Sequence, residues 1–318
     1  MKNQSDLYQL LILSQDYKVY AQIIEQAGLR FLSIHAFDDP FQAIKKVNNC
    51  DVIFGEPSLV CQIINSLPCI KWVQSSWAGV EPLLAPGLQR NYLLSNSRNV
   101  YGAMMSEYVF GYLLAIERRI LQRWQSQHKG VWDDSTVGTL KGKRIGLMGV
   151  GSIGSCLAAT AQHFEMEVFG YTRMSESCLE VDHYFHGQEI LDFVNSLDYL
   201  VCSLPGTVKT KGLINEEVFS ALPSKTWLIN VGRGNILDEI ALMKALKHGS
   251  LAGAVLDVFV EEPLRFDHPL WHTPNTFITC HTAAKNYLPD IASLFIENCK
   301  SFINGMPLRY LVDFEQQY

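Results

Sequence analysis

The chain contains little charge, since charged residues make up only 18% of its 318 residues. Its 26 basic residues are outnumbered by 32 acidic ones, and they form no run or stripe. Proteins that bind nucleic acids usually present a basic patch to the phosphates. The formal net charge of −6 therefore argues against a nucleic-acid partner.

Long apolar runs and paired cysteines are missing as well. The longest apolar stretch, around residues 109–116, is far shorter than the roughly 20 residues of a membrane span. The eight cysteines show no C-x-x-C pair or metal-ligand spacing, which is typical of reduced thiols in a cytoplasmic protein. An isolated H-x-x-H pattern, His183 and His186, fits a surface or packing role better than a metal site. We therefore expect a cytoplasmic protein with no membrane-spanning segment and no bound metal ion.

Hydrophobic residues make up 48% of the chain, as in a globular protein. Single cores stop growing at roughly 250–300 residues, so we expect two domains in a chain of 318 residues. Apolar runs alternate with helical patterns in two series, which predicts crossover connections and parallel sheets. The predicted fold class is α/β, with two Rossmann-like or flavodoxin-like domains, doubly wound parallel sheets and a cleft between them.

The expected elements follow from these patterns. In the first series we expect strands at 10–13, 31–34, 52–54 and 72–74, and helices at 17–26, 41–48 and 59–65. In the second we expect strands at 144–148, 167–172, 199–204, 226–231, 254–259 and 276–279, and helices at 152–164, 189–196, 216–222 and 239–248. Apolar residues at helical spacing over 103–125 predict one long helix, in the core or across a subunit boundary. A last helix over 287–302 is expected to pack back on the first domain.

Three glycines, Gly149, Gly151 and Gly154, form a G-x-G-x-x-G motif between a predicted strand and a predicted helix. That setting is typical of dinucleotide binding. The first glycine permits a tight turn, the second lets the backbone approach the pyrophosphate, and the third allows close helix–strand packing. The diphosphate would lie on backbone N–H groups near Ser152 and Ile153, although a purely structural glycine turn is an alternative.

The next strand should end in the residue that contacts the adenosine ribose. A carboxylate there binds the 2′-hydroxyl of NAD, whereas an Arg accommodates the 2′-phosphate of NADP. This strand ends in Thr172 and Arg173, with no carboxylate before Glu176. The pattern favours NADP, the alternative being that Arg173 is a solvated surface residue and NAD binds.

Three reactive side chains, Arg233, Glu262 and His281, follow predicted strands of the second series. Open parallel sheets bind ligands beyond the carboxyl ends of their strands, so these side chains should share one edge. An Arg, a carboxylate and a His beside a nicotinamide are suited to carbonyl reduction.

With these motifs the chain resembles the D-isomer-specific 2-hydroxyacid dehydrogenase family, and within it the glyoxylate/hydroxypyruvate reductase branch. The resemblance covers nearly the whole chain. Its motifs are residues 76–81, 106–108, 149–154, 204–205, 210–214, 230–234, 256–263 and His281. The resemblance implies a dinucleotide-binding domain over 98–285 and a substrate domain over 1–97, completed by 286–318.

The resemblance also implies roles for single residues. His281 would protonate the carbonyl oxygen as hydride arrives from the nicotinamide, and Glu262 would hold the imidazole and favour its protonated form. Arg233 would orient the 2-oxo acid and polarise its carbonyl. Backbone N–H groups around Ala78 and Gly79 would hold the substrate carboxylate. Further cofactor contacts are implied for Leu204, Pro205, Thr210, Val231 and Asp257, the last of them to the nicotinamide carboxamide.

Some positions depart from the family pattern or leave alternatives. Cys280 stands where the family usually has Pro, which could loosen the loop of His281, and Glu81 replaces a common Asp. Glu56 lies on a loop that approaches the substrate in the family, so we expect it to point away or to bias selectivity. The resemblance implies a homodimer through 103–125 and the following segment. Trp132 would either enter the partner's site or pack within its own chain.

The sequence as a whole predicts an enzyme that reduces a small 2-oxo acid, glyoxylate or hydroxypyruvate, to the D-2-hydroxy acid. NADP(H) is the preferred cofactor and NAD(H) is possible. One alternative is another 2-hydroxyacid dehydrogenase activity, such as phosphoglycerate oxidation. The other is a non-catalytic protein that senses the nucleotide.

Overall fold

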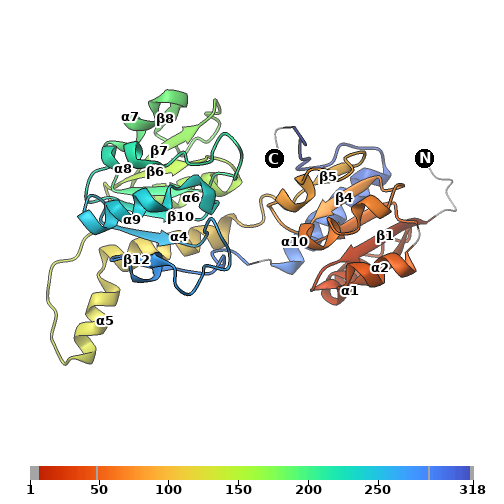
Figure 1. Cartoon of the computed structure of the whole chain (residues 1–318), viewed down its shortest axis with the longest axis horizontal. Coiled ribbons are helices and arrows are strands. Elements are labelled where there is room, and N and C mark those ends of the chain that lie inside the picture. The colour runs from red at the N-terminus through yellow and green to blue at the C-terminus, as the bar shows by residue number, and fades with distance from the viewer. Residues whose placement is uncertain (1–6, 48, 286, 316–318) are drawn as a thin grey trace. The chain divides into compact units, whose positions relative to one another are not determined.

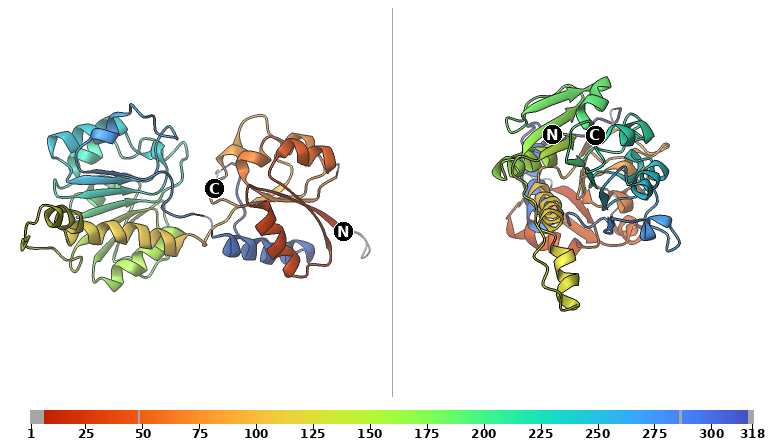
Figure 2. Two further views of the ribbon diagram at one scale, coloured as in Figure 1. Left: turned by 90° about the horizontal axis from the view of Figure 1, so that it is seen from below. Right: turned by 90° about the vertical axis from the view of Figure 1, so that its left-hand side faces the viewer.

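The computed structural model describes residues 7–47, 49–285 and 287–315. The chain divides into two compact units, one formed by Met1–Val100 with Asn286–Tyr318 and the other by Tyr101–Lys285. Each unit is built on its own parallel sheet (Figure 1). Helices cover both faces of each sheet, as the left view of Figure 2 shows. The predicted α/β fold class is confirmed.

The first unit has a five-stranded sheet with the order β2-β1-β3-β4-β5, in which all neighbours are parallel. This is the flavodoxin-like order. The strands are β1 (Tyr8–Leu13), β2 (Leu32–Phe37), β3 (Val52–Gly55), β4 (Trp72–Ser75) and β5 (Leu93–Ser95). The helices are α1 (Tyr17–Gln26), α2 (Pro40–Lys46), α3 (Pro57–Val60) and the returning α10 (Leu288–Ile303), with 3₁₀ turns at Ile64–Ser66 and Glu81–Leu84.

The last helix, α10, is part of the core of the first unit. Its Phe295 ring stacks on Phe54 and Trp72, with centroid distances of 4.6 and 5.4 Å. On the same helix, the fully buried Asn298 donates to Gln74 Oε1 of β4 at 2.9 Å. The unit therefore needs both ends of the chain to bury its sheet.

The second unit has a seven-stranded parallel sheet with the order β12-β11-β10-β9-β6-β7-β8. The strands are β6 (Arg144–Met148), β7 (Glu167–Thr172), β8 (His183–His186), β9 (Tyr199–Cys202), β10 (Trp227–Asn230), β11 (Gly253–Leu256) and β12 (Thr276–Ile278). The helices are α4 (Gly102–Glu117), α5 (Ile120–His128), α6 (Ser152–His163), α7 (Ile190–Val194), α8 (Glu216–Ala221) and α9 (Glu239–His248), with 3₁₀ turns at Gly187–Glu189, Gly234–Ile236 and Pro269–His272.

Successive residues of the central strands enter two different cores. Leu200 and Leu228 pack beneath α7, α8 and α9, whereas their neighbours Val201 and Ile229 pack beneath α4 and α6. Because both faces are covered, both sets of side chains must be apolar. This explains the nearly continuous hydrophobic runs in the sequence.

The prediction of a single long helix over 103–125 is wrong. The chain instead forms α4 and α5, which meet at Arg119, a residue with a left-handed φ of 51°. The apolar spacing continues across the break, but Ile120 and Trp124 are 52% and 58% exposed. The helical periodicity therefore predicted the apolar faces of both helices, but it did not show that the chain changes direction between them. Figure 1 shows α5 and the segment after it extending away from the body of this unit.

Other differences are local. The helix expected over 59–65 is replaced by α3 and a 3₁₀ turn, and residue 48, the expected end of another helix, lies outside the described residues. Strands β5 and β8 were not predicted because one has three residues and the other begins and ends with histidine. No helix among the described residues is long and apolar enough to cross a membrane.

Candidate active site

The carboxyl ends of all seven strands of the second sheet lie at one edge, because the strands are parallel. Strand β6 lies where the strand order reverses, with β7 on one side and β9 on the other. Open α/β sheets bind ligands at this position. The G-x-G-x-x-G loop directly follows β6, so the motif lies at the predicted place.

The three glycines of this loop have different structural requirements. Gly149 has a φ of +96°, which disfavours any residue with a side chain. A Cβ on Gly154 would lie 2.1 Å from the Gly149 carbonyl oxygen, so this glycine allows α6 to pack against the turn. A Cβ on Gly151, which precedes α6, would meet nothing within 4 Å. The space beside Gly151 is therefore open at the amino end of a helix, where a pyrophosphate can bind.

This difference predicts contrasting effects for two substitutions. Gly151→Ala should leave thermal unfolding unchanged, because its Cβ is accommodated, yet should weaken nicotinamide dinucleotide binding by about tenfold or more. Gly154→Ala should instead lower the unfolding temperature. Fluorescence titration with NADH or NADPH and a thermal scan measure both effects. Unchanged dinucleotide affinity in Gly151→Ala would show that the ligand does not approach this backbone.

Loops after β9 and β10 border the glycine loop. Leu204 follows β9, and its Cδ2 would lie 3.0 Å from a Cβ at Gly149. Thr210 Oγ1 donates to the Pro205 carbonyl at 2.6 Å and so folds the segment between them. Val231 is 4% exposed, so its side chain belongs to the core. Cofactor contacts of these four residues stay predictions.

At the end of β12, His281 is paired with Glu262 from the loop after β11. The distance between His281 Nδ1 and Glu262 Oε2 is 2.8 Å, and the Phe259 backbone N–H donates to Glu262 Oε1 at 2.9 Å. A carboxylate on Nδ1 assigns a proton to that nitrogen. Nε2 is then the ring nitrogen available for proton exchange, and the His281 side chain is 54% exposed.

The His281 loop is held by Asp257, which is 1% exposed at the end of β11. The Asp257 carbonyl accepts from the His281 N–H at 2.8 Å. Its carboxylate accepts from the N–H groups of Thr282 and Ala283 at 2.8 and 3.0 Å. These bonds keep His281 at a left-handed φ of 54°, a conformation that costs energy in a non-glycine residue. Cys280, which precedes His281 in this loop, is exposed.

Two residues not predicted from the sequence, Thr279 and Tyr108, extend this support. Thr279 Oγ1 donates to Asp257 Oδ1 at 2.5 Å, which leaves the Tyr108 hydroxyl to donate to Thr279 Oγ1 at 2.7 Å. Burial raises the pKa of Tyr108, so it stays a donor. Asp257 thus accepts three hydrogen bonds to its carboxylate, and one site remains for the predicted carboxamide contact. No local sequence signal connects residues so far apart.

Arg233 follows β10 and is half-buried. Asn230 organises this turn, because its side chain donates to the Arg233 carbonyl at 3.0 Å and accepts from the Gly232 N–H at 3.1 Å. A Cβ on Gly234 would lie 1.9 Å from the carbonyl carbon of Phe259. The Arg233 turn is therefore in direct contact with the segment that holds Glu262. The structure brings the three predicted catalytic residues to the ends of three adjacent strands.

Ala78 and Gly79 belong to the first unit, where they follow β4. Both are half-buried, and no described residue accepts a hydrogen bond from either backbone N–H. Such N–H groups are suited to an anion. Glu56, at the end of β3, accepts from the Ser14 hydroxyl and the Gln15 N–H, both at 2.7 Å, so one of its oxygens is directed at the turn after β1.

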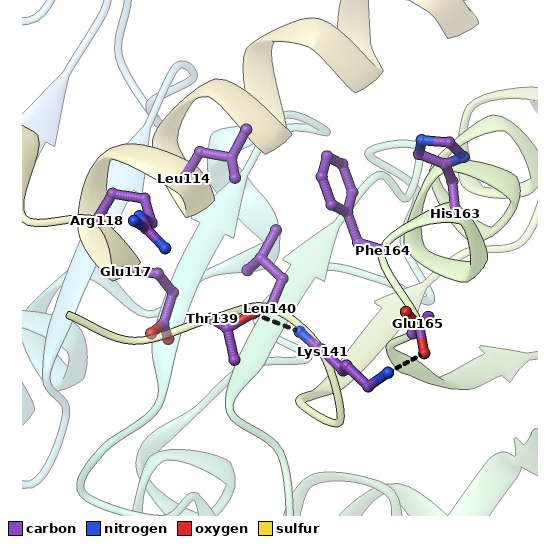
Figure 3. A pocket seen from close by; sticks show the side chains of 9 residues that line it. All are labelled: Leu114, Glu117, Arg118, Thr139, Leu140, Lys141, His163, Phe164 and Glu165. Atoms are coloured by element: carbon purple, nitrogen blue, oxygen red, sulfur yellow. Dashed lines mark hydrogen bonds and ion pairs between the residues drawn. The ribbon is translucent and has the colours of Figure 1, made fainter.

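A pocket of about 320 Å³ lies elsewhere on the second unit (Figure 3). Its lining includes Glu117 at the end of α4, Lys141 before β6 and Glu165 before β7. The amino ends of the strands therefore border it, opposite the edge with the glycine loop. None of the predicted site residues lines this pocket. No group of three or more His, Cys, Asp or Glu in the described part of the chain could hold a metal ion.

Comparison with known proteins agrees with this arrangement. The sequence profile of the D-isomer specific 2-hydroxyacid dehydrogenase NAD-binding domain matches residues 110–283. Glyoxylate/hydroxypyruvate reductase A of Photorhabdus laumondii is 35% identical over 219 residues, 68% of this chain and 69% of that protein.

Two solved structures extend the similarity to almost the whole chain. A D-isomer specific 2-hydroxyacid dehydrogenase family protein from Aeromonas salmonicida is 36% identical, with a TM-score of 0.92 over 97% of this chain and 100% of that one. A D-isomer specific 2-hydroxyacid dehydrogenase from Xanthobacter autotrophicus, in complex with NADPH and MES, is 27% identical, with a TM-score of 0.84 over 98% and 100%. This chain thus belongs to the D-isomer specific 2-hydroxyacid dehydrogenase family and is an NAD(P)-dependent oxidoreductase acting on CH–OH groups.

Proposed function

We propose that this protein reduces a small 2-oxo acid, glyoxylate or hydroxypyruvate, to the D-2-hydroxy acid, with NADPH as the preferred reductant. The observation that carries the proposal is the 2.8 Å pair between His281 and Glu262, next to the Arg233 turn at the cofactor edge of the sheet. Relatives named glyoxylate reductase and glyoxylate/hydroxypyruvate reductase support the choice of substrate.

In the proposed reaction, reduced nicotinamide, when bound, supplies a hydride to the carbonyl carbon. His281 Nε2 gives its proton to the carbonyl oxygen, so that C=O becomes CH–OH, and it takes that proton back in the reverse direction. Glu262 holds the imidazole through Nδ1 and stabilises its positive charge. Arg233 binds and polarises the 2-oxo acid, and the N–H groups of Ala78 and Gly79 bind its carboxylate.

The preference for NADPH rests on the end of β7. Thr172 and Arg173 occupy the strand end, and the Arg173 side chain is exposed. A carboxylate that would bind the 2′-hydroxyl of NADH is missing at this position. The NADPH complex of the Xanthobacter relative supports the same preference.

A cofactor and substrate panel tests the proposal. Purified protein is given NADPH or NADH with glyoxylate, hydroxypyruvate and larger 2-oxo acids, and for the reverse direction it is given NADP+ or NAD+ with phosphoglycerate. Loss of nicotinamide absorbance should be fastest with NADPH and one of the two small acids. Preference for phosphoglycerate would replace the proposed substrate, and cofactor binding without turnover on any acid would favour a nucleotide sensor.

We also propose a homodimer formed through α5 and the segment after it. Trp132 is 92% exposed and Val131 is 56% exposed. Trp132 therefore does not pack against the described residues of its own chain, which was the alternative. Large apolar side chains clustered on an extension usually contact a partner. Sedimentation should give twice the mass of one chain, and Trp132→Ser with Trp124→Ser should shift it toward the monomer. A monomeric parent would contradict the proposal.

A cytoplasmic location is proposed from the cysteines. All eight are unpaired, and Cys50, Cys202 and Cys299 are buried. Burial raises the pKa of each of these three thiols to about 12, so they stay protonated and unreactive. Free thiols in this number are typical of a reducing compartment. Labelling of the protein in fractionated cells tests the location.

A further inference from the structure

The turn that carries Arg173 is connected to the neighbouring strand by one histidine. In the parallel pairing of β7 with β8, Thr172 lies opposite His186, so both strand ends meet at the cofactor edge. His186 is the second histidine of the H-x-x-H pattern. The proposed function gives it no role.

The His186 ring contacts both ends of the turn formed by residues 172–176. Nδ1 lies 3.1 Å from the Thr172 carbonyl oxygen and 3.1 Å from Thr172 Oγ1. Nε2 lies 2.8 Å from Glu176 Oε1. Thr172 Oγ1 donates to the Ser175 carbonyl at 2.7 Å and closes the turn from inside. Arg173 therefore lies on a turn that His186 holds at its first and last residues.

These partners require a doubly protonated ring. A carbonyl oxygen can only accept, and so can an ionised carboxylate, so both ring nitrogens must donate. Thr172 Oγ1 has already given its proton to Ser175 and also faces Nδ1 as an acceptor. The hydrogen bond with Glu176 raises the pKa of His186, as does the bond with the Thr172 carbonyl. His186 is therefore an imidazolium in this arrangement.

Other charged groups near His186 act in the same direction. Glu189, on the turn after β8, accepts from the His186 backbone N–H at 2.7 Å, and its charge also favours the imidazolium. The ring of Tyr184 stacks on His186 with a centroid distance of 6.3 Å. His186 also forms an ion pair with Glu176, so this carboxylate of the 172–176 turn has a positive partner.

We propose that His186 and Glu176 are positioning residues for cofactor selection, and that the charged His186 keeps the 172–176 turn in the form that binds the 2′-phosphate of NADPH. This inference rests on the proposed preference for NADPH. Loss of the imidazolium charge would free the turn and leave Glu176 to repel the phosphate. NADH, which has no 2′-phosphate, would be affected little.

The sign of the pH effect follows from the raised pKa of His186. We call the contacts of the charged His186 ring with Thr172 and Glu176 the clamp. The clamp is complete below the ordinary histidine pKa of about 6.5, and it is lost as pH rises through the higher pKa of His186 in the folded protein. The phosphate loses its second proton near pH about 6, so above neutrality its charge is constant. A decline in NADPH affinity from neutral to alkaline pH therefore reports His186 and not the ligand.

The test measures dissociation constants of NADPH and NADH by fluorescence titration across this pH range. For the parent protein, NADPH should bind about tenfold more weakly at the alkaline end, while NADH binding stays flat. His186→Gln, which keeps one donor but cannot be charged, should bind NADPH about tenfold more weakly at neutral pH and show no pH dependence. Glu176→Gln should move the inflection to lower pH. His183→Gln is the matched control on the same strand, because it pairs with Glu167 instead.

Two results would overturn the inference. One is a parent protein whose NADPH affinity does not change with pH relative to its NADH affinity. The other is a His186→Gln variant that binds both cofactors as His183→Gln does. Because the readout is binding, it is independent of turnover. Protein that binds NADPH with the expected profile but reduces no 2-oxo acid would contradict the proposed function alone. Reduction of 2-oxo acids with a flat profile would contradict the clamp alone.

Discussion

Replacing His281 with glutamine is expected to lower kcat for 2-oxo acid reduction by about 10²–10⁴-fold, the usual contribution of a positioned acid or base. Glutamine can still hydrogen-bond to Glu262, but its amide N–H is not acidic enough to transfer a proton to the carbonyl oxygen. The glycine loop follows β6 and not β12, so the dissociation constant of NADPH should stay unchanged. Steady-state rates of nicotinamide oxidation measure the effect on kcat, and fluorescence titration measures the dissociation constant of NADPH.

The matched control is His272→Gln, which changes an exposed histidine of the same unit outside the site. Its kcat should equal that of the parent. Glu262→Gln should reduce kcat, because the neutral amide no longer offers His281 Nδ1 a charged hydrogen-bond acceptor. Full activity in His281→Gln would remove this residue as the proton donor and leave the family assignment intact.

The second large effect concerns stability, and we expect Asn298→Leu to lower the free energy of unfolding by about 3 kcal/mol or more. Asn298 is fully buried on α10 and makes three hydrogen bonds. It donates to Gln74 Oε1 at 2.9 Å and to the Arg309 carbonyl at 3.1 Å, and it accepts from the Arg309 N–H at 2.8 Å. Leucine has a similar size but would leave two backbone groups of Arg309 without partners. Each such group costs about 1–3 kcal/mol.

The polar network around Asn298 increases this cost. Ser95 Oγ donates to the same Gln74 oxygen at 2.8 Å and accepts from Trp72 Nε1 at 2.8 Å. Networks of this kind are stabilising only when every member is satisfied. The loss should therefore affect the β4–β5 side of the sheet as well as α10.

Urea unfolding with hydrogen exchange measures the effect, since exchange separates the two units, which need not unfold together. Amides of β3 and β4 should lose protection in Asn298→Leu, whereas those of β6 and β9 should not. Asn304→Ala is the control, because the side chain of this exposed residue at the end of the same helix makes one hydrogen bond, to the Lys300 carbonyl. Equal stability of Asn298→Leu and the parent would show that α10 is dispensable to the first unit.

Much of the fold was predictable because burial leaves a local signature. Strands β6 and β7 and helices α1 and α9 begin and end at the predicted residues. Their apolar spacing reflects the faces that they bury, and such spacing is visible within a few residues of sequence. The break at Arg119 was not predictable in this way, because an exposed apolar face in α5 has the same periodicity as a buried one.

The sequence by itself determined the fold class, the glycine loop and the identity of the candidate catalytic residues, because each depends on short motifs at the ends of apolar strands. Only the tertiary structure showed that Asp257 holds the His281 loop, that Tyr108 and Thr279 support it, and that His186 spans the Arg173 turn. These contacts join residues from different strands and helices. Their hydrogen bonds form only when the sheet brings distant segments together, and no periodicity in the chain encodes the pairing.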